Sequence, residues 1–231
     1  MIILGISDSI ESHACIIKDG KLVASISEER LSRLKADSGY PRKSIEKVIK
    51  IANISKSQID LVALAGFENG LFQALYKPNA KFTVKDWIKQ SNLYWEPKLL
   101  KGKRLTELDD FLIWENQIKG IKQDPYYKFV KLAKKTNRKF YNRTFNHIRR
   151  EVISKQLGIK KNKIYTFRHE DCHKFYGLFS QVIKKDKNLI IIIEGGGDDS
   201  SATISIAQNN SIIEKYRTNR AMLGRLYRYV T

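Results

Sequence analysis

Residues 1–26 read MIILGISDSIESHACIIKDGKLVASI, three short apolar runs separated by polar breaks. Each run has the length and composition of a strand, so we expect strands at Ile2–Ile6, His13–Lys18 and Leu22–Ile26. Asp19-Gly20 joins the last two runs, and this dipeptide favours the tight turn of an antiparallel hairpin. The stretch therefore predicts one strand followed by a hairpin.

The residues after this hairpin continue an α/β pattern. Pro41 suits the first turn of a helix, and Ile45, Val48 and Ile49 then fall on one helical face. Ile59–Ala65 is a further apolar run of strand length. A strand and a hairpin at the start of a chain resemble the opening of a ribonuclease-H-like domain, and we expect one here.

A second pattern of three strands separated by turns begins near residue 189. The expected strands are Leu189–Ile193, Ala202–Ala207 and Ile212–Tyr216. Two such domains, each offering a polar loop to phosphates, form ATPases of the actin and sugar-kinase type. We therefore predict an α/β, actin-like ATPase (ribonuclease-H-like) fold, with the first subdomain at 1–185 and an incomplete start of the second at 186–231.

A basic segment lies between the two patterns. Lys77–Lys163 holds 23 Lys and Arg against 8 Asp and Glu, most of the net charge of +19. We expect a helical insertion at about 77–162 that includes a helix at Tyr126–Leu157, and a separate helix after it at His169–Lys184. Such a surplus attracts anions such as nucleic acid, but no nucleic-acid-binding motif accompanies it. A solvated, lysine-rich surface is the plainer interpretation.

The composition indicates a folded chain with a sizeable core. The hydrophobic fraction is 42%, and there are ten Phe and eleven Tyr. Leu189–Ile193, the longest apolar run, is too short to cross a bilayer, and the first residues lack the basic flank of a signal peptide. With Cys15 and Cys172 as its cysteines, the chain has no disulfide framework, so we expect a cytoplasmic protein.

Two histidines and a glutamate are the strongest candidates for a metal site. His169 and His173 are four residues apart, which places both imidazoles on one helical face. Glu194 ends the apolar run of the second pattern, where a carboxylate opens onto a cleft. Imidazole pairs of this spacing suit a divalent metal, although a chance pairing stays the plainer alternative.

Glycines, serines and cations offer a second kind of site. Gly195, Gly196 and Gly197 leave room for a phosphate, and Ser200 adds a hydroxyl donor. A tight turn would also use these glycines. Further upstream, Arg30 and Lys35 follow the third strand and suit a small phosphorylated substrate, the alternative being an exposed charged loop.

Four motifs together resemble the NodU/CmcH family, the O-carbamoyltransferases of nodulation and antibiotic biosynthesis. Residues 28–41, EERLSRLKADSGYP, are similar to the family pattern EERFxRxKxDxGxP. Residues 169–177, HEDCHKFYG, resemble HHxxHAxxAFY, and residues 194–206, EGGGDDSSATISI, resemble DGGGDxxSxT. Residues 222–227, MLGRLY, resemble SLGxFYxxVT. All four occur in the family order.

The resemblance implies carbamoyl transfer from carbamoyl phosphate, through an ATP-derived adenylate, to a hydroxyl of a sugar or secondary metabolite. It implies that ATP and a divalent metal, iron-like or Mg, act as cofactors, with His169, His173 and Glu194 as metal ligands. It also implies catalytic roles for Glu11 and Lys35. The substrate or nucleotide contacts that it implies are Ser12, Arg30, Gly195, Gly196, Gly197 and Ser200.

The chain departs from the family pattern at several positions. Ile10-Glu11 stands where the family has His-Asp, Glu170 where it has a second histidine, and Lys174 where it has alanine. Glu194 replaces an aspartate. The YrdC-like domain that makes the adenylate lies outside the 231 residues, so we expect a truncated or split form that is inactive without a second chain. A non-catalytic basic protein that binds nucleic acid, or a scaffold, is the alternative.

Overall fold

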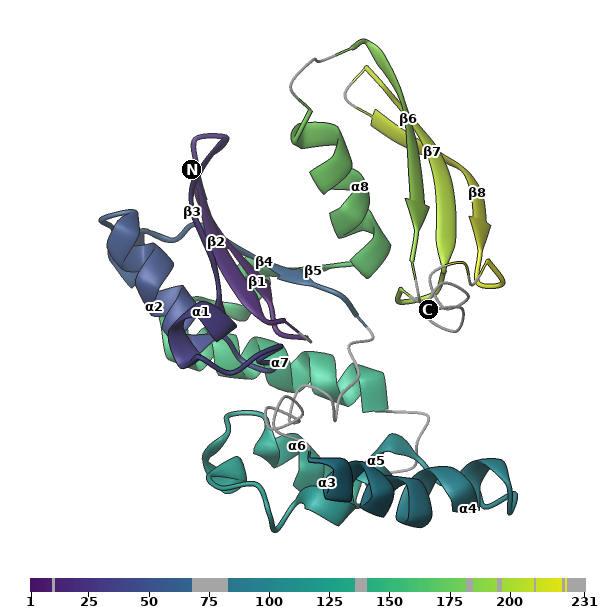
Figure 1. Ribbon diagram of the computed structural model, residues 1–231. Coiled ribbons are helices and arrows are strands. Elements are labelled where there is room, and N and C mark those ends of the chain that lie inside the picture. Colours follow the sequence, from purple (N-terminus) through teal and green to yellow (C-terminus); the bar gives the residue numbers. More distant parts are fainter. Residues whose placement is uncertain are drawn as a thin grey trace. The chain divides into compact units, whose positions relative to one another are not determined.

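The computed structural model describes residues 1–9, 11–67, 83–135, 141–181, 185–194, 197–209, 211–221 and 223. Contacts divide the chain into two compact units (Figure 1). Unit 1 comprises Met1–Leu64 and Asn69–Tyr165, and unit 2 comprises Ala65–Glu68 and Thr166–Thr231. This division groups the helix that begins at His169 with the second set of strands, whereas the sequence-based boundary after residue 185 places it with the first.

Unit 1 is built on a mixed five-stranded sheet with the order β3-β2-β1-β4-β5. β1 pairs antiparallel with β2, β2 pairs antiparallel with β3, and β1 pairs parallel with β4. The strands are β1 (Ile2–Ser7), β2 (His13–Lys18), β3 (Lys21–Ser27), β4 (Leu61–Ala65) and β5 (Ile164–Phe167). These observations confirm an α/β fold with a mixed sheet.

The first hairpin follows the sequence prediction closely. β2 has the predicted bounds, and Asp19 and Gly20 turn the chain with φ angles of 50° and 77°, the left-handed region that a tight hairpin requires. On the adjoining strand, Gly5 lies opposite Cys15. A Cβ on Gly5 would come within 2.6 Å of the Cys15 Sγ, so the close pairing of β1 and β2 requires glycine there.

The helices of unit 1 cover the sheet and extend into the basic segment. α2 contacts β2 and β3, and its buried Ile45 and Val48 join Leu4, Ile16 and Val62 in one continuous core. The α-helices are α1 (Glu28–Ser32), α2 (Arg42–Ile51), α3 (Val84–Gln90), α4 (Glu96–Leu99), α5 (Glu107–Trp114), α6 (Tyr127–Ala133) and α7 (Tyr141–Leu157). The shorter helical turns are Lys56–Gln58, Ser91–Trp95, Ile121–Gln123 and Lys161–Lys163. Phe111, Phe129 and Phe145 extend the same core among α5, α6 and α7.

A buried ion pair ties the helices to the first strand. Asp8, directly after β1, accepts two hydrogen bonds from Arg149 of α7, at 2.8 Å from Nε and 2.6 Å from Nη2. The hydroxyl of Tyr126, just before α6, donates to the same carboxylate at 2.6 Å. All three residues are fully buried. Because an unpaired buried charge is costly, these bonds hold α6 and α7 in register with β1.

The Glu28 carboxylate caps the N-terminus of α2. This buried carboxylate accepts the N–H groups of Lys43 and Ser44 at 3.1 and 2.8 Å, at the N-terminus of α2. These N–H groups have no partner within the helix, so the carboxylate replaces the missing side-chain cap at Pro41. The first residue of the EERLSRLKADSGYP motif therefore fixes where α2 begins.

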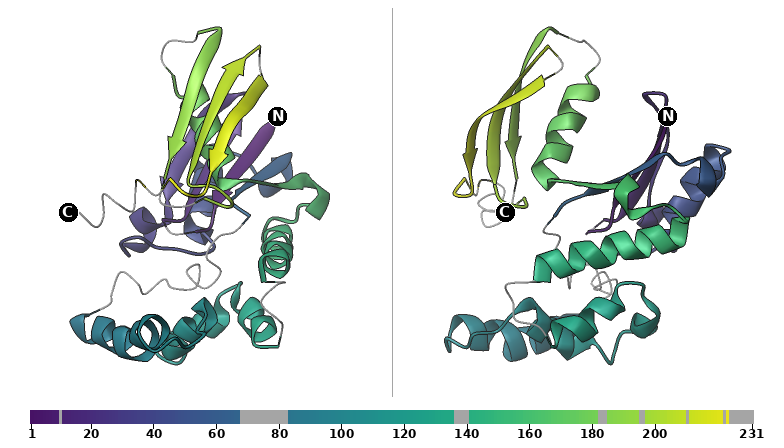
Figure 2. Two further views of the ribbon diagram at one scale, coloured as in Figure 1. Left: turned by 90° about the vertical axis from the view of Figure 1, so that its right-hand side faces the viewer. Right: turned by 180° about the vertical axis from the view of Figure 1, so that it is seen from behind.

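Unit 2 consists of α8 (His169–Phe179) and an antiparallel sheet of order β6-β7-β8. The strands are β6 (Lys187–Ile193), β7 (Ala202–Gln208) and β8 (Ser211–Thr218). α8 packs against one face of the sheet (Figure 2). On the opposite face the side chains of Leu189, Ile191 and Ile193 are exposed. α8 ends at Phe179, earlier than the predicted Lys184. Within the described ranges, no helix has the length and apolar character needed to cross a bilayer.

Candidate functional site

Three side chains of unit 2 converge on one point. His169 Nε2 and His173 Nε2 are 3.0 Å apart. The Glu194 Oε2 lies 2.7 Å from the first nitrogen and 3.7 Å from the second. The structure therefore brings together the three residues that the sequence nominates as metal ligands.

The local structure explains this convergence. The histidines lie on the first two turns of α8, at the spacing that places their rings on the same face, with centroids 4.6 Å apart. Glu194 directly follows β6, and its N–H donates to Ser201 O at 2.9 Å, which extends the pairing of β6 and β7 by one residue. Because α8 packs against β6, the end of β6 lies next to the imidazoles.

The donor set fits a divalent transition metal. An ion about 2.1 Å from each ligand separates neighbouring ligand atoms by about 3.0 Å in octahedral and about 3.4 Å in tetrahedral geometry. The observed separations of 2.7, 3.0 and 3.7 Å bracket these values. Two imidazoles and a carboxylate suit iron or zinc, whereas Mg²⁺ prefers oxygen ligands throughout. Among the described residues, nothing donates a hydrogen bond to the buried Glu194 Oε1.

Gly197 is confined by the carboxylates around it. A Cβ at this position would lie 2.8 Å from Glu194 Oε1, 2.9 Å from Glu170 Oε2 and 2.9 Å from Ser200 O. The Gly197 N–H donates to Ser200 O at 2.7 Å and closes the turn. The Ser200 hydroxyl is buried and has no hydrogen-bond partner in the part of the chain that the structure describes. Gly195 and Gly196 lie outside the described residues, so a phosphate contact by these residues remains a prediction.

Asp198 connects the Glu194 loop to the first turn of α8. Its Oδ2 accepts the N–H of His169 at 2.7 Å and the N–H of Phe67 at 2.8 Å. Its own N–H donates to Glu170 Oε2 at 3.2 Å. Two hydrogen bonds in opposite directions therefore join Asp198 to α8, next to the first metal-ligand candidate.

Charged side chains continue from Glu170 to β8. Glu170 is fully buried, and its Oε1 accepts a hydrogen bond from Arg217 Nη1 at 2.6 Å. Burial alone would raise the pKa of Glu170, but hydrogen bonds from its own N–H, from Arg217 and from Asp198 N–H hold that pKa below its ordinary value. Arg217 also pairs with Asp199 and Glu214, and Lys174 pairs with Glu214 at 2.6 Å.

The remaining sequence candidates belong to unit 1. Glu11 lies in an exposed turn with a φ of 59°. Ser12 is fully buried, and its hydroxyl donates to Asp37 O at 3.1 Å. Lys35 is exposed and lies 3.6 Å from Glu29 Oε2, and Arg30 is exposed on α1. Their proposed roles remain predictions.

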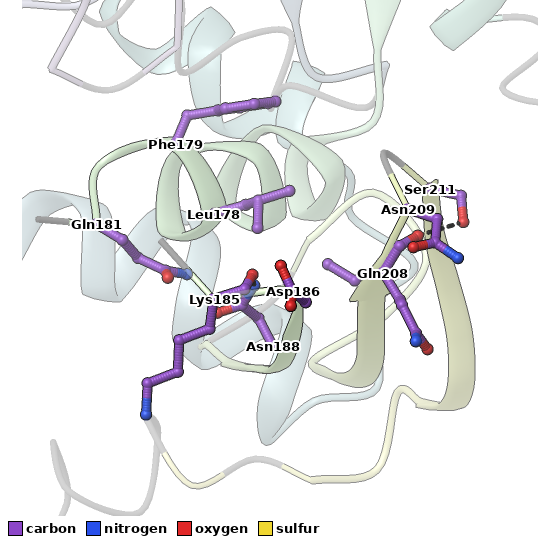
Figure 3. A pocket seen from close by; sticks show the side chains of 10 residues that line it. Leu178, Phe179, Gln181, Lys185, Asp186, Asn188, Gln208, Asn209 and Ser211 are labelled. Carbon is purple, nitrogen blue, oxygen red and sulfur yellow. Dashed lines mark hydrogen bonds between the residues drawn. The ribbon is translucent and has the colours of Figure 1, made fainter. Parts of the chain in front are cut away.

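Two cavities lie apart from these candidates. Figure 3 shows the first, about 280 Å³, at the end of α8 beside the β7–β8 turn, with Leu178, Asp186 and Gln208 in its wall. The second, about 650 Å³, lies in unit 1 beside Tyr40 and Arg42. Neither is lined by any of the predicted catalytic, nucleotide-binding or metal-binding residues. We therefore locate the candidate site from the side-chain geometry.

Sequence reasoning missed the groups that support the candidate ligands. Arg217 is 47 residues from Glu170, and no local pattern links the two. Asp198 was visible as an acid beside the glycines, but its hydrogen bonds to α8 depend on tertiary packing. In the sequence, Glu170 differs from the family motif by standing in place of a histidine, but this difference alone predicts neither of its partners.

A family model described as "Carbamoyltransferase N-terminus" matches residues 2–231, which is nearly the whole chain. This chain therefore belongs to that carbamoyltransferase family. The resemblance inferred from the four motifs is thereby confirmed.

Two relatives have shorter matches. Nodulation protein NolNO of Sinorhizobium fredii is 38% identical over 53 residues, or 23% of this chain and 8% of NolNO. The uncharacterized protein sll1178 of Synechocystis sp. is 31% identical over 119 residues, or 47% of this chain and 19% of that protein. The aligned part of the chain thus spans less than a fifth of either relative.

Proposed function

We propose that this chain takes part in carbamoyl transfer from carbamoyl phosphate, through an ATP-derived adenylate, to a hydroxyl of a sugar or secondary metabolite. The family match over residues 2–231 carries this proposal. The strand order β3-β2-β1-β4-β5 adds support, because it agrees with the ribonuclease-H-like arrangement expected of an actin-like ATPase domain. We propose this activity for a whole carbamoyltransferase, of which these 231 residues correspond to the N-terminal region.

We further propose that His169, His173 and Glu194 hold a divalent metal, with iron or zinc favoured over Mg²⁺ by the two imidazoles. When bound, such an ion would supply positive charge near the phosphate oxygens that become negative during transfer. The protein's own part is to hold the three ligands on α8 and at the end of β6. Gly197 and Ser200 would lie beside the nucleotide phosphates.

Metal binding by the purified chain tests this site directly. We expect Co²⁺, used as a spectroscopic probe, to bind with one ion per chain, and His169→Ala or His173→Ala to weaken binding at least tenfold. His147→Ala is the matched control, because this histidine is exposed on α7. Isothermal titration calorimetry measures the affinities. Equal Co²⁺ affinity in all three variants and the unmodified chain would contradict the proposed metal site.

An activity assay tests the transfer itself. The 231-residue chain is incubated with ATP, carbamoyl phosphate and sugar or aminoglycoside acceptors, and carbamoylated product is measured by mass spectrometry. We expect no product from the chain alone, because the resemblance assigns adenylate formation to a YrdC-like domain. Addition of a second chain that supplies the rest of the second subdomain and the YrdC-like domain should produce it. Product without that addition would contradict the expected inactivity of the chain alone.

A further inference from the structure

Glu170 is an unusual residue to find on the inner face of α8. It is fully buried, yet it carries a carboxylate, and burial of an unpaired charge is strongly unfavourable. Arg217 of β8 supplies the compensating charge at 2.6 Å.

The pair contacts the segment that carries the candidate ligands. Glu170 Oε2 accepts the N–H of Asp198, and the Asp198 carboxylate accepts the N–H of His169. Glu170 Oε2 also borders the position where a Cβ of Gly197 would lie, as does Glu194 Oε1. Glu170 therefore fixes the loop after Glu194 against the first turn of α8, where His169 begins the helix.

Lys174 provides a natural comparison within the same interface. It lies one helical turn after Glu170, is 4% exposed, and pairs with Glu214 of β8 at 2.6 Å. Like Glu170, it joins α8 to β8 through an ion pair, although Glu214 is partly exposed and also pairs with Arg217. Among the described residues, Lys174 donates to Asp171 and Glu214, whereas Glu170 bonds directly to Asp198 of the Gly197–Asp198 segment. Lys174 therefore anchors α8 to β8 without bonding to that segment.

We propose that Glu170 and Arg217 are positioning residues that set the separation between Glu194 and the two histidines, and so the affinity and geometry of the metal site. This inference rests on the proposed metal site. The structure assigns Glu170 to the contact with Asp198, and assigns Arg217 to the ion pair that holds the Glu170 side chain in place. Neither residue is one of the three proposed ligands.

The test compares three variants of the full chain: Glu170→Ala, Arg217→Gln and Lys174→Met. Co²⁺ affinity is measured by calorimetry, and the visible absorption bands of bound Co²⁺ report its coordination geometry. Glu170→Ala and Arg217→Gln should raise the dissociation constant about 10- to 100-fold and alter the absorption bands. Lys174→Met should leave both close to those of the unmodified chain, although it too removes an ion pair between α8 and β8.

A further variant covers the case in which Glu170→Ala does not fold, as judged by circular dichroism. Glu170→Gln keeps the shape and an acceptor for the Asp198 N–H but loses the ion pair. It should weaken Co²⁺ binding less than Arg217→Gln does.

Two results would overturn the positioning role. One is unchanged Co²⁺ affinity and spectrum in the folded Glu170 and Arg217 variants. The other is a loss in Lys174→Met as large as theirs, which would reduce Glu170 to general anchoring of α8. If the unmodified chain bound no Co²⁺, the proposed metal site would itself be wrong, which is a distinguishable outcome.

Discussion

Gly197 shows how strongly one residue can be constrained by its neighbours. The sequence suggested that this glycine leaves space for a phosphate. The structure adds a different reason, because two carboxylates and a carbonyl oxygen occupy the space that any side chain would need. Glycine at this position lets Glu194 and Glu170 come close to the same turn.

Replacement of this glycine should therefore affect metal binding. Gly197→Ala places a methyl group within 3 Å of Glu194 Oε1 and Glu170 Oε2, so one carboxylate must move. We expect Co²⁺ affinity, measured by calorimetry, to fall about 10- to 100-fold. Gly177→Ala is the control, because no atom lies within 4 Å of a Cβ there. That change in α8 should preserve binding and raise the free energy of unfolding by about 0.5–1 kcal/mol. Equal affinities in the two variants would contradict this steric explanation.

At the scale of elements, charged side chains join the helices of the basic segment. Glu115, directly after α5, accepts a hydrogen bond from the Tyr127 hydroxyl at 2.5 Å and pairs with Lys134 at 2.8 Å. Burial would raise the pKa of Glu115, but Lys134 and Tyr127 outweigh burial and hold the pKa below its ordinary value of 4.5. This carboxylate therefore links α5 to α6.

Glu115 should make stability depend on pH under acidic conditions. Because its folded-state pKa is depressed, its contribution is present above pH 4.5 and is lost as pH falls through the lower folded-state value. Glu115→Gln should lower the free energy of unfolding at pH 7 by about 1–2 kcal/mol and flatten its decline below pH 4.5. Urea denaturation across pH measures both effects. Glu46→Gln, which removes an exposed carboxylate on α2, is the control. An identical profile for both variants would contradict this account.

At the scale of the whole molecule, unit 1 depends on a contact between distant parts of the chain. Asp8 and Arg149 are separated by 141 residues, and both side chains have 0% exposure. Their ion pair and the Tyr126 hydroxyl join the end of β1 to α6 and α7. The basic segment is thereby part of the same core as the sheet.

Breaking this pair should destabilise unit 1 strongly. Arg149→Met leaves the buried Asp8 carboxylate without its opposite charge, and we expect a loss of about 3–5 kcal/mol in the free energy of unfolding. Lys128→Met is the matched control, since it breaks the exposed Lys128–Glu151 pair between α6 and α7 and should cost less than about 1 kcal/mol. Chemical denaturation followed by circular dichroism measures both. Similar losses in the free energy of unfolding would show that the buried pair stabilises the protein no more than the exposed pair does.

The sequence predicted those features that depend on neighbouring residues. The Asp19-Gly20 hairpin, the helix after Pro41 and the strands around them have short-range signals, and each is present. The convergence of His169, His173 and Glu194 also followed from helical spacing and a strand end. By contrast, Asp8–Arg149 and Glu170–Arg217 are pairings at long range, which tertiary packing alone selects.

Element ends were less predictable than the elements themselves. The strand predicted from Ile59 begins at Leu61, because the Ile59 N–H instead donates to Lys56 O and closes the helical turn Lys56–Gln58. The helix predicted to reach Lys184 ends at Phe179, and no local stop signal marks that point. The catalytic and nucleotide-binding assignments rest on family resemblance, and they remain predictions.

The exposed face of β6 has a consequence for how the protein behaves in solution. Among the described strands β6 is an edge strand, it contains four consecutive isoleucines, and Ile191 and Ile193 are more than half exposed. Such a strand can template intermolecular β-pairing and fibril growth. Repulsion between chains that each carry a net charge of +19 opposes this process. Concentrated stocks should therefore turn cloudy first in strong salt, or in alkaline buffers near the isoelectric point of about 9.8.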